Sequence, residues 1–207
     1  MATPVNSIYG LLGLAIAYLL GDIPFGYLLV KVTSGRDIRA AGSGNIGATN
    51  VLRTTGRAAG VATLLLDIAK GYLAVWLEGR LTGGNAAWMG AAALAVMIGH
   101  SYPAFLHFRG GKAVASFVGA YLCLSPLPLA AVLVVFVVMV AWTRHISLGS
   151  IVAAATFPLA VWLIEHPPAA VLVTAVLSGA LIVYRHRENI VRLRAGTESV
   201  FSFGSRK

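Results

Sequence analysis

Charged residues are scarce in this chain of 207 residues. Only 11% are Asp, Glu, Lys or Arg, whereas 58% are hydrophobic and the mean hydropathy is +0.82. Soluble domains carry about 25% charged residues, so this chain has too few polar groups to cover a globular surface. The composition excludes an ordinary soluble protein and predicts an all-α, polytopic integral membrane protein.

Cysteine is nearly absent, and the first thirty residues hold no basic side chain. Cys123 is the single Cys and lies in an apolar run, which excludes a disulfide framework and a Cys-based metal site. No Lys or Arg precedes Lys31, so the basic region of a cleavable signal peptide is missing. We expect the first apolar stretch to be a retained helix, and we expect no metal and no other cofactor.

Seven apolar stretches are candidates for transmembrane helices, since a bilayer core requires about 20 apolar residues per helix. The fourth is short, and Ser125, Pro126 and Pro128 separate it from the fifth because proline lacks a backbone donor. The seven predicted spans cover residues 8–30, 60–78, 86–106, 113–124, 127–142, 148–164 and 169–184. We expect them to form one transmembrane domain over residues 1–207.

The distribution of Lys and Arg predicts the orientation of these spans. With seven spans, 14 of the 16 basic residues share one face, whereas fusing residues 113–142 into one helix divides them 7 against 8. The N-terminus is therefore predicted outside and the C-terminus in the cytoplasm. The net charge of +9 is interpreted as a topology signal with some attraction to anionic lipid, not as nucleic-acid binding. The 14 residues are Lys31, Arg36, Arg39, Arg53, Arg57, Arg109, Lys112, Arg144, Arg185, Arg187, Arg192, Arg194, Arg206 and Lys207.

Three ionisable side chains, Asp22, Asp67 and Lys70, fall inside predicted spans. Such groups are costly in lipid and usually face the interior of a helix bundle. Asp67 and Lys70 are three residues apart and share a helical face, so they can neutralise each other. Two interpretations stay open: a structural ion pair and a proton or ion relay.

Polar residues gather in three segments, all on the predicted cytoplasmic face. We call them the first segment (42-GSGNIGATNVLR-53), the second segment (99-GHSYPAFLHFRGGKA-113) and the third segment (186-HRENIVRLRAGTE-198). The predicted external connections are short and chemically plain. Chemistry that needs polar side chains is therefore expected on the cytoplasmic side.

The first segment contains G-S-G-N-I-G, which fits the dinucleotide-binding fingerprint, but no βαβ unit surrounds it. Closely spaced glycines still let backbone N–H groups converge on an anion. Ser43, Asn45, Thr49 and Asn50 add neutral donors, and Arg53 adds a cation able to hold a phosphate. The segment is either an anion site or a flexible loop.

The second segment reads F-R-G-G-K-A and is not a Walker P-loop, because Ala113 follows the Lys. Arg109, two glycines and Lys112 nevertheless predict a second anion site. His100, across the loop, is either a capping residue or part of that site. Two anion sites on one face indicate two phosphate-bearing ligands brought together.

The third segment follows the last span. His186 and Asn189 share a face if the helix of that span continues. Glu198 is expected to pair with an arginine or with backbone donors, as a structural tie.

A membrane transporter is the alternative function, although we find no inverted repeat. A hydrolase using Ser43 and His186 lacks the G-x-S-x-G motif.

The three segments in this order, with G-D-I-P-F-G-Y in the first span and L-L-D-I-A-K-G in the second, resemble the acyl-phosphate:glycerol-3-phosphate acyltransferases of bacteria, the PlsY family. The likeness covers nearly the whole chain. One departure is Ala113, where the family usually has glycine after the Lys.

This resemblance implies acyl transfer from acyl phosphate to the 1-hydroxyl of sn-glycerol 3-phosphate, giving 1-acyl-glycerol 3-phosphate (lysophosphatidic acid) and phosphate. It implies a multi-pass protein of the bacterial inner membrane with a cytoplasmic active site and membrane lipid around it. The His-x4-Asp dyad of other glycerol-phosphate acyltransferases is absent, since no Asp stands five residues after any His. The implied catalytic residues are Ser43, Arg53, His186 and Asn189. The predicted substrate-binding residues are Gly44, Asn45, Gly47, Thr49, Asn50, His100, Gly110, Gly111 and Lys112, and Asp67, Lys70 and Glu198 are predicted to be structural.

Overall fold

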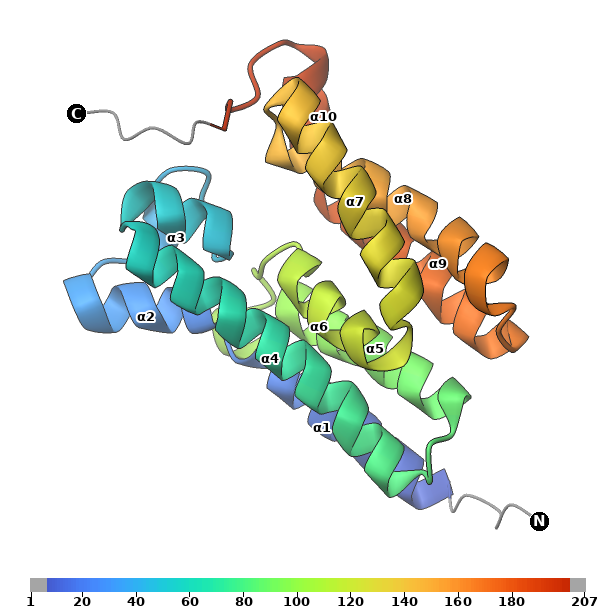
Figure 1. Cartoon of the computed structure of the whole chain (residues 1–207). Helices are drawn as coiled ribbons and strands as arrows, with labels where there is room; N and C mark the ends of the chain where they lie inside the picture. Colours follow the sequence, from blue (N-terminus) through green and yellow to red (C-terminus); the bar gives the residue numbers. More distant parts are fainter. Residues whose placement is uncertain (1–6, 202–207) are drawn as a thin grey trace. The chain divides into compact units, whose positions relative to one another are not determined.

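The computed structural model describes residues 7–201, and the regular elements in that range are helices (Figure 1). This confirms the all-helical fold class. The chain forms two compact units, residues 1–124 (unit 1) and 125–207 (unit 2). Arg206 and Lys207, two residues of the predicted charge pattern, lie outside the described residues.

Unit 1 carries the first and second segments. The longest helix of unit 1, α4, packs mainly on α6, and α1 packs mainly on α5. The elements of unit 1 are α1 (Ser7–Asp22), α2 (Phe25–Ser34), η1 (Ile38–Ala40), α3 (Ala48–Thr54), α4 (Arg57–Leu81), α5 (Ala86–Ser101), η2 (Ala104–Leu106) and α6 (Val114–Leu124).

Glycine brings the helices of unit 1 unusually close together. A Cβ on Gly119 of α6 would overlap the carbonyl oxygen of Ile68 on α4, and a Cβ on Gly71 of α4 would overlap that of Ser116 on α6. Small residues let transmembrane backbones approach in this way, because apolar side chains alone gain little from association in lipid. Gly99 of α5 packs against α1 by the same device.

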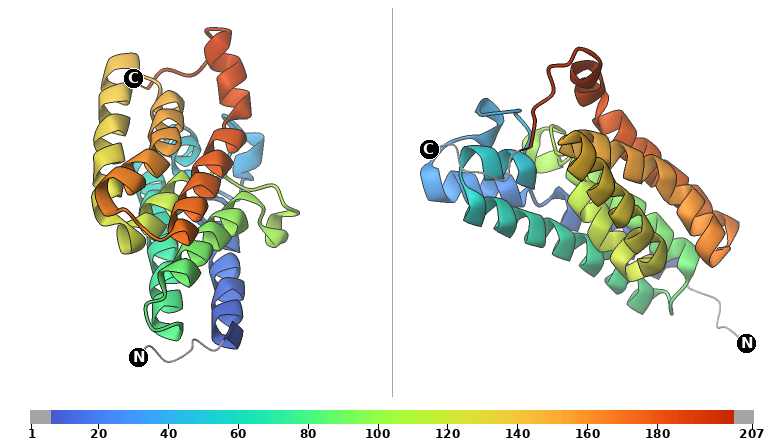
Figure 2. Two further views of the ribbon diagram at one scale, coloured as in Figure 1. Left: turned by 90° about the vertical axis from the view of Figure 1, so that its right-hand side faces the viewer. Right: turned by 45° about the horizontal axis from the view of Figure 1, so that its top comes forward.

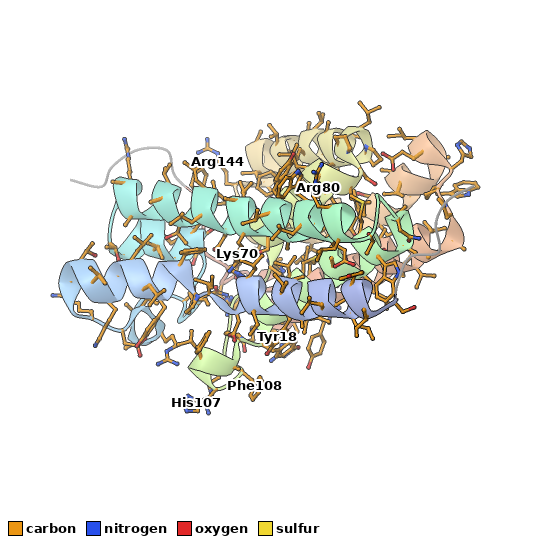
Figure 3. All side chains as sticks on the ribbon, turned by 90° about the horizontal axis from the view of Figure 1, so that it is seen from below. Tyr18, Lys70, Arg80, His107, Phe108 and Arg144 are labelled. Carbon is orange, nitrogen blue, oxygen red and sulfur yellow. The ribbon has the colours of Figure 1, made fainter. Side chains whose placement is uncertain are left out.

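The predicted first span, residues 8–30, is broken between α1 and α2. The cause is Pro24, which has no N–H to continue the hydrogen-bond ladder. Lys70 Nζ of α4 donates hydrogen bonds to the carbonyl oxygens of Gly21 at 2.9 Å and Ile23 at 2.8 Å. A buried lysine thus supplies hydrogen-bond donors to carbonyl groups at the break between the two helices. Figure 3 shows Lys70 lying where α1 passes into α2.

Unit 2 contains α7 (Pro126–Thr143), α8 (Ile146–Glu165), α9 (Ala169–Arg185) and α10 (Arg187–Arg194), with α8 packed between α7 and α9. The break predicted at Ser125 is present, and Pro126 begins α7, where a missing N–H costs nothing. The Ser125 hydroxyl donates to Glu165 Oε2 at 2.8 Å and so ties the start of α7 to the end of α8.

Five helical segments among residues 7–201 are long and apolar enough to cross a bilayer. A sixth qualifies if α9 and α10, bent by 54°, form one span, and α6 is shorter. These segments agree with an integral membrane protein. The seven-span order, its orientation and a single domain over residues 1–207 stay predictions.

Candidate active site

Asn50 organises the first segment. Its Oδ1 accepts a hydrogen bond from Ser43 N at 2.9 Å, and its Nδ2 donates to Asn45 O at 2.8 Å and Ala41 O at 3.0 Å. The side chain is buried, with 2% of its surface exposed. One amide therefore pins three points of the loop that precedes α3, so the segment is not a freely flexible loop.

The loop presents its catalytic candidates to the outside of unit 1. Ser43 stands between Gly42 and Gly44, which have φ of 58° and 70°, values that glycine adopts without strain. Ser43, Gly44 and Arg53 are exposed. The chain reversal around Ser43 therefore depends on glycine for its backbone conformation.

The rest of the first segment shapes the entry to α3. Asn45 Oδ1 accepts from Gly47 N at 2.8 Å, which closes a side-chain turn. Gly47 caps α3 in extended conformation, and Thr49 lies half-buried in the first turn. α3 has only seven residues, so its dipole adds little to an anion site at this segment.

A small apolar cluster joins the first segment to the second. It consists of the buried side chains Val30, Ile38, Ile46, Val51 and Leu106. Ile46 and Val51 belong to the first segment and Leu106 to the second, so unit 1 holds both predicted anion sites on one shared core. The structure thereby brings together two motifs that are about fifty residues apart in the chain.

The two glycines of the second segment lie where the neighbouring atoms leave no room for a Cβ. A Cβ on Gly110 would overlap His100 O, and a Cβ on Gly111 would overlap Nε2 of the buried His100 ring. Backbone hydrogen bonds run from Gly111 N to His100 O at 3.0 Å and from Gly110 N to Ser101 O at 3.2 Å. The Gly-Gly-Lys turn therefore rests directly on the end of α5.

Ala113 adopts the left-handed conformation that the family's usual glycine would take easily, with φ of 60°. A residue with a Cβ adopts this conformation at a cost of about 1–2 kcal/mol. Lys112, immediately before it, is half-buried. The loop that leads to this turn stands out from the helices of unit 1 (Figure 2, left), and His107 and Phe108 lie at its far end (Figure 3).

A buried polar group lies beneath the turn. Lys70 Nζ is 2.9 Å from Asp67 Oδ1, so the ion pair that their spacing predicts is present. The same carboxylate oxygen lies 3.6 Å from His100 Nδ1. Asp67, Lys70 and His100 are each at most 4% exposed.

The third segment lies in unit 2 and does not continue the last span as a straight helix. α9 ends at Arg185 and α10 begins at Arg187, with a bend of 54° at His186. The premise that one continuous helix puts His186 and Asn189 on the same face is therefore wrong. His186 Nδ1 is 2.8 Å from Ile182 O, and both His186 and Asn189 are buried.

Glu198 ties this segment together. Its carboxylate accepts hydrogen bonds from Ser147 Oγ at 2.8 Å, Asn189 Nδ2 at 2.6 Å and Arg192 Nε at 2.8 Å. Burial alone would raise the pKa of Glu198, but these three donors outweigh it and lower the pKa below its usual value. The loop after α10 is thereby fixed to the start of α8.

Comparison with known proteins identifies the family. The family model described as glycerol-3-phosphate acyltransferase matches residues 11–196. The chain belongs to the glycerol-3-phosphate acyltransferase family. Two similar relatives carry that name: one from Geobacter sulfurreducens, 51% identical over 90% of this chain and 95% of its own, and one from Trichlorobacter lovleyi, 49% identical over 93% and 97%.

Two solved structures of PlsY, an integral membrane glycerol 3-phosphate acyltransferase, resemble this acyltransferase along most of its length. The glycerol 3-phosphate form is 39% identical, with a TM-score of 0.88 over 93% of this chain and 96% of that chain. The lysophosphatidic acid form is 37% identical, with a TM-score of 0.84 over 93% and 95%. The acyltransferase is therefore an integral membrane protein, and the transporter alternative is not favoured.

Sequence reasoning missed several contacts in and next to the three polar segments. Asp37 binds the Arg39 guanidinium at 2.7 Å, and the hydrogen bond from Arg39 lowers the pKa of Asp37. Asp22 Oδ1 accepts from Phe105 N at 3.4 Å, which holds the second segment to α1. Ser147 is a partner of Glu198. Only the position of Asp22 inside an apolar stretch signalled a role, because the other contacts join residues without a recognisable motif.

Proposed function

We propose that this chain transfers a fatty acyl group from acyl phosphate to the 1-hydroxyl of sn-glycerol 3-phosphate. The hydroxyl oxygen attacks the carbonyl carbon, the bond from that carbon to the phosphate oxygen breaks, and 1-acyl-glycerol 3-phosphate and phosphate leave. The observation that carries the proposal is the match to the acyltransferase family over residues 11–196. The two ordered anion-site motifs of unit 1 and the missing His-x4-Asp dyad support the choice of donor.

Acyl phosphate is a mixed anhydride with a good leaving group, so the protein has no need of a covalent intermediate. Its task is to hold two anions close together and to stabilise the charge that develops on the carbonyl oxygen. In this proposal Ser43 donates a hydrogen bond and Arg53 supplies the cation; both are exposed on the ordered first segment. Asn45 and Asn50 serve indirectly, because backbone N–H groups of the loop already occupy the side-chain oxygens of both residues.

The second segment is the proposed site for glycerol 3-phosphate. Gly110 and Gly111 place backbone against the end of α5, where no Cβ fits, and Lys112 follows them with its ammonium. A phosphate is compact and doubly charged, so a lysine next to close-packed backbone suits it. His100 lies under the same turn and completes the wall of the site.

For the third segment, which lies in unit 2, the family resemblance supports catalytic roles for His186 and Asn189. A carbonyl oxygen only accepts hydrogen bonds, so the contact with Ile182 O assigns the proton to Nδ1 of His186. Nε2 is then the basic nitrogen of the neutral ring, as a proton acceptor requires. The hydroxyl proton goes either to this nitrogen or to the departing phosphate. Glu198 keeps Asn189 in place.

The proposal includes a location. Seven spans with the N-terminus outside put all three segments on the cytoplasmic side of a bacterial inner membrane. α4 has 25 residues and is about 37 Å long, enough to cross a hydrocarbon core of about 30 Å. Acyl donor and product would then reach the site from the lipid.

The donor assignment is tested with purified full-length protein in lipid mesophase or detergent. Glycerol 3-phosphate is supplied with palmitoyl phosphate or, in parallel, with palmitoyl-CoA, and lysophosphatidic acid is measured. We expect product from the phosphate donor alone, lost in Lys112→Ala and kept in the matched variant Lys31→Ala, whose lysine lies near the end of α2. Turnover with palmitoyl-CoA would reject the donor assignment, and absence of product from both donors would reject the acyltransferase reaction.

The orientation is tested by cysteine labelling. In a Cys123→Ala background the only thiol is introduced at one end of α4, as Arg57→Cys or Arg80→Cys; both positions are exposed. A membrane-impermeant maleimide should label position 80 in cells with a permeabilised outer membrane, and position 57 only in inverted vesicles. The opposite pattern would overturn the proposed orientation, and labelling of both positions from one side would overturn α4 as a span.

A further inference from the structure

We propose that Asp67 is a positioning residue for the turn formed by Gly110, Gly111 and Lys112, and that it acts through His100. The inference rests on the proposed glycerol 3-phosphate site and extends it to Asp67, a buried side chain on α4. In this inference, Asp67 acts on a ligand through the groups that lie between it and the turn.

The path from Asp67 to the turn is short and buried at every step. Asp67 Oδ1 lies 3.6 Å from His100 Nδ1. The opposite ring nitrogen, Nε2, faces Gly111 so closely that a Cβ there would overlap it. The His100 backbone oxygen accepts from Gly111 N at 3.0 Å. The imidazole thus lies between a carboxylate on one side and the turn on the other.

Asp67 is itself fixed. Lys70 Nζ binds it at 2.9 Å and also reaches the carbonyl oxygens of Gly21 and Ile23 at the break between α1 and α2. The ammonium therefore donates hydrogen bonds to two carbonyl oxygens and forms an ion pair with the carboxylate. A displaced His100 ring would push on Gly111. The break in the first span is therefore connected to the turn at Gly111 through Lys70, Asp67 and His100.

An alternative is that the ion pair only stabilises unit 1. The two interpretations differ in what an Asp67→Asn variant does to ligand binding. A purely structural pair changes the melting temperature and leaves the affinity of the folded protein for glycerol 3-phosphate unchanged. A positioning residue changes that affinity in folded protein, because the turn loses its support.

The matched control is Glu78→Gln. Glu78 is a second buried carboxylate on the same helix, fully buried, and neither of its oxygens has a hydrogen-bond partner among the described residues. It lies eleven residues further along α4, about 16 Å along the axis. A general effect of neutralising a buried acid on α4 would appear in both variants.

The experiment measures equilibrium binding of glycerol 3-phosphate by calorimetry on full-length protein without any acyl donor, alongside thermal unfolding. We expect Asp67→Asn to weaken binding by about tenfold and Glu78→Gln to leave it unchanged. Because removing one partner of a buried ion pair is strongly destabilising, the double variant Asp67→Asn, Lys70→Gln removes both charges, and it should show the same weakening.

Wild-type affinity in a folded Asp67→Asn or double variant overturns the proposal, as does equal weakening in Glu78→Gln. In turnover assays the KM for glycerol 3-phosphate should rise while kcat and the KM for acyl phosphate stay near wild type. Wild-type protein that binds glycerol 3-phosphate but rejects acyl phosphate would contradict the proposed donor and leave this inference standing. Wild-type protein that does not bind glycerol 3-phosphate would overturn both.

Discussion

Replacing Asn50 with alanine tests whether one buried amide sets the conformation of the first segment. The substitution removes the hydrogen bonds to Ser43 N, Asn45 O and Ala41 O, which are 2.9, 2.8 and 3.0 Å long. Each contributes about 1 kcal/mol, so the ordered loop loses about 3 kcal/mol relative to disordered conformations. Since about 1.4 kcal/mol corresponds to a factor of ten, the ordered fraction of the loop falls by up to roughly 150-fold.

We expect this loss in kcat/KM, because the exposed Ser43 is held in place through its own backbone N–H. Asn50→Asp keeps the size and shape of the side chain, but it replaces the donating Nδ2 with an oxygen that faces the carbonyl oxygens of Ala41 and Asn45. This variant should therefore be no more active than Asn50→Ala. The control is Asn85→Ala, which removes the N-cap of α5 at the other end of unit 1 and should cost about 1 kcal/mol of stability without changing kcat/KM.

The assay is turnover of palmitoyl phosphate and glycerol 3-phosphate at a temperature well below every variant's unfolding transition. A kcat/KM for Asn50→Ala within about twofold of wild type would refute the reasoning, since the hydrogen bonds would then not control the loop. An equal loss in Asn85→Ala would refute it too, because the effect would come from global stability.

Three further predictions concern packing, backbone strain and pH. Gly119→Ala should lower the free energy of unfolding by about 1–3 kcal/mol, because its Cβ would overlap Ile68 O. Gly79→Ala, whose nearest neighbour is the flexible Met89 Sδ at 3.2 Å, should be neutral or slightly stabilising in the same thermal unfolding experiment; equal losses would contradict the close-packing argument. Ala113→Gly should change stability by less than about 1 kcal/mol, because relief of backbone strain is offset by the loss of a buried methyl group and by a more flexible unfolded chain. Ala113→Val should weaken glycerol 3-phosphate binding measured by calorimetry, since a β-branched residue rarely adopts positive φ, and wild-type affinity would contradict this. The stability that Glu198 contributes to unit 2 is fully present above its unfolded-state pKa near 4.5 and is lost as the pH falls through its lower folded pKa. Unfolding followed against pH should show a steeper acid-side loss in wild type than in Glu198→Gln, and parallel curves would exclude the role of this carboxylate.

Local patterns in the sequence predicted much of the architecture. Long apolar stretches predict helices because a membrane leaves a chain few other ways to satisfy its backbone. The break at Ser125 follows from the prolines around it, and the three polar segments identify the family through residue types at fixed spacing. These features depend on neighbouring residues, so the chain order itself contains them.

Other features depend on residues far apart in the chain. Lys70 reaches Gly21, 49 residues away, and Glu198 reaches Ser147, 51 residues away. No local pattern connects such pairs, since their contact exists only after the helices pack. The bend at His186 is of the same kind: α10 turns away from the axis of α9, while Glu198 anchors the following loop to α8.

The glycines show most clearly which features the sequence predicts and which depend on the tertiary structure. From the sequence, the glycines of G-S-G-N-I-G and F-R-G-G-K-A indicate loops that can surround an anion. The tertiary structure separates them into Gly42 and Gly44, which are needed for positive φ, and Gly110 and Gly111, which are needed because His100 and its backbone leave no room for a Cβ. Composition predicted a helical membrane protein, and the resemblance of its three polar segments to a known family indicated an acyltransferase. Only the packing of helices distant in sequence decided which buried groups hold the turns of its predicted anion sites in place, because steric fit and hydrogen-bond partners are properties of neighbours in space.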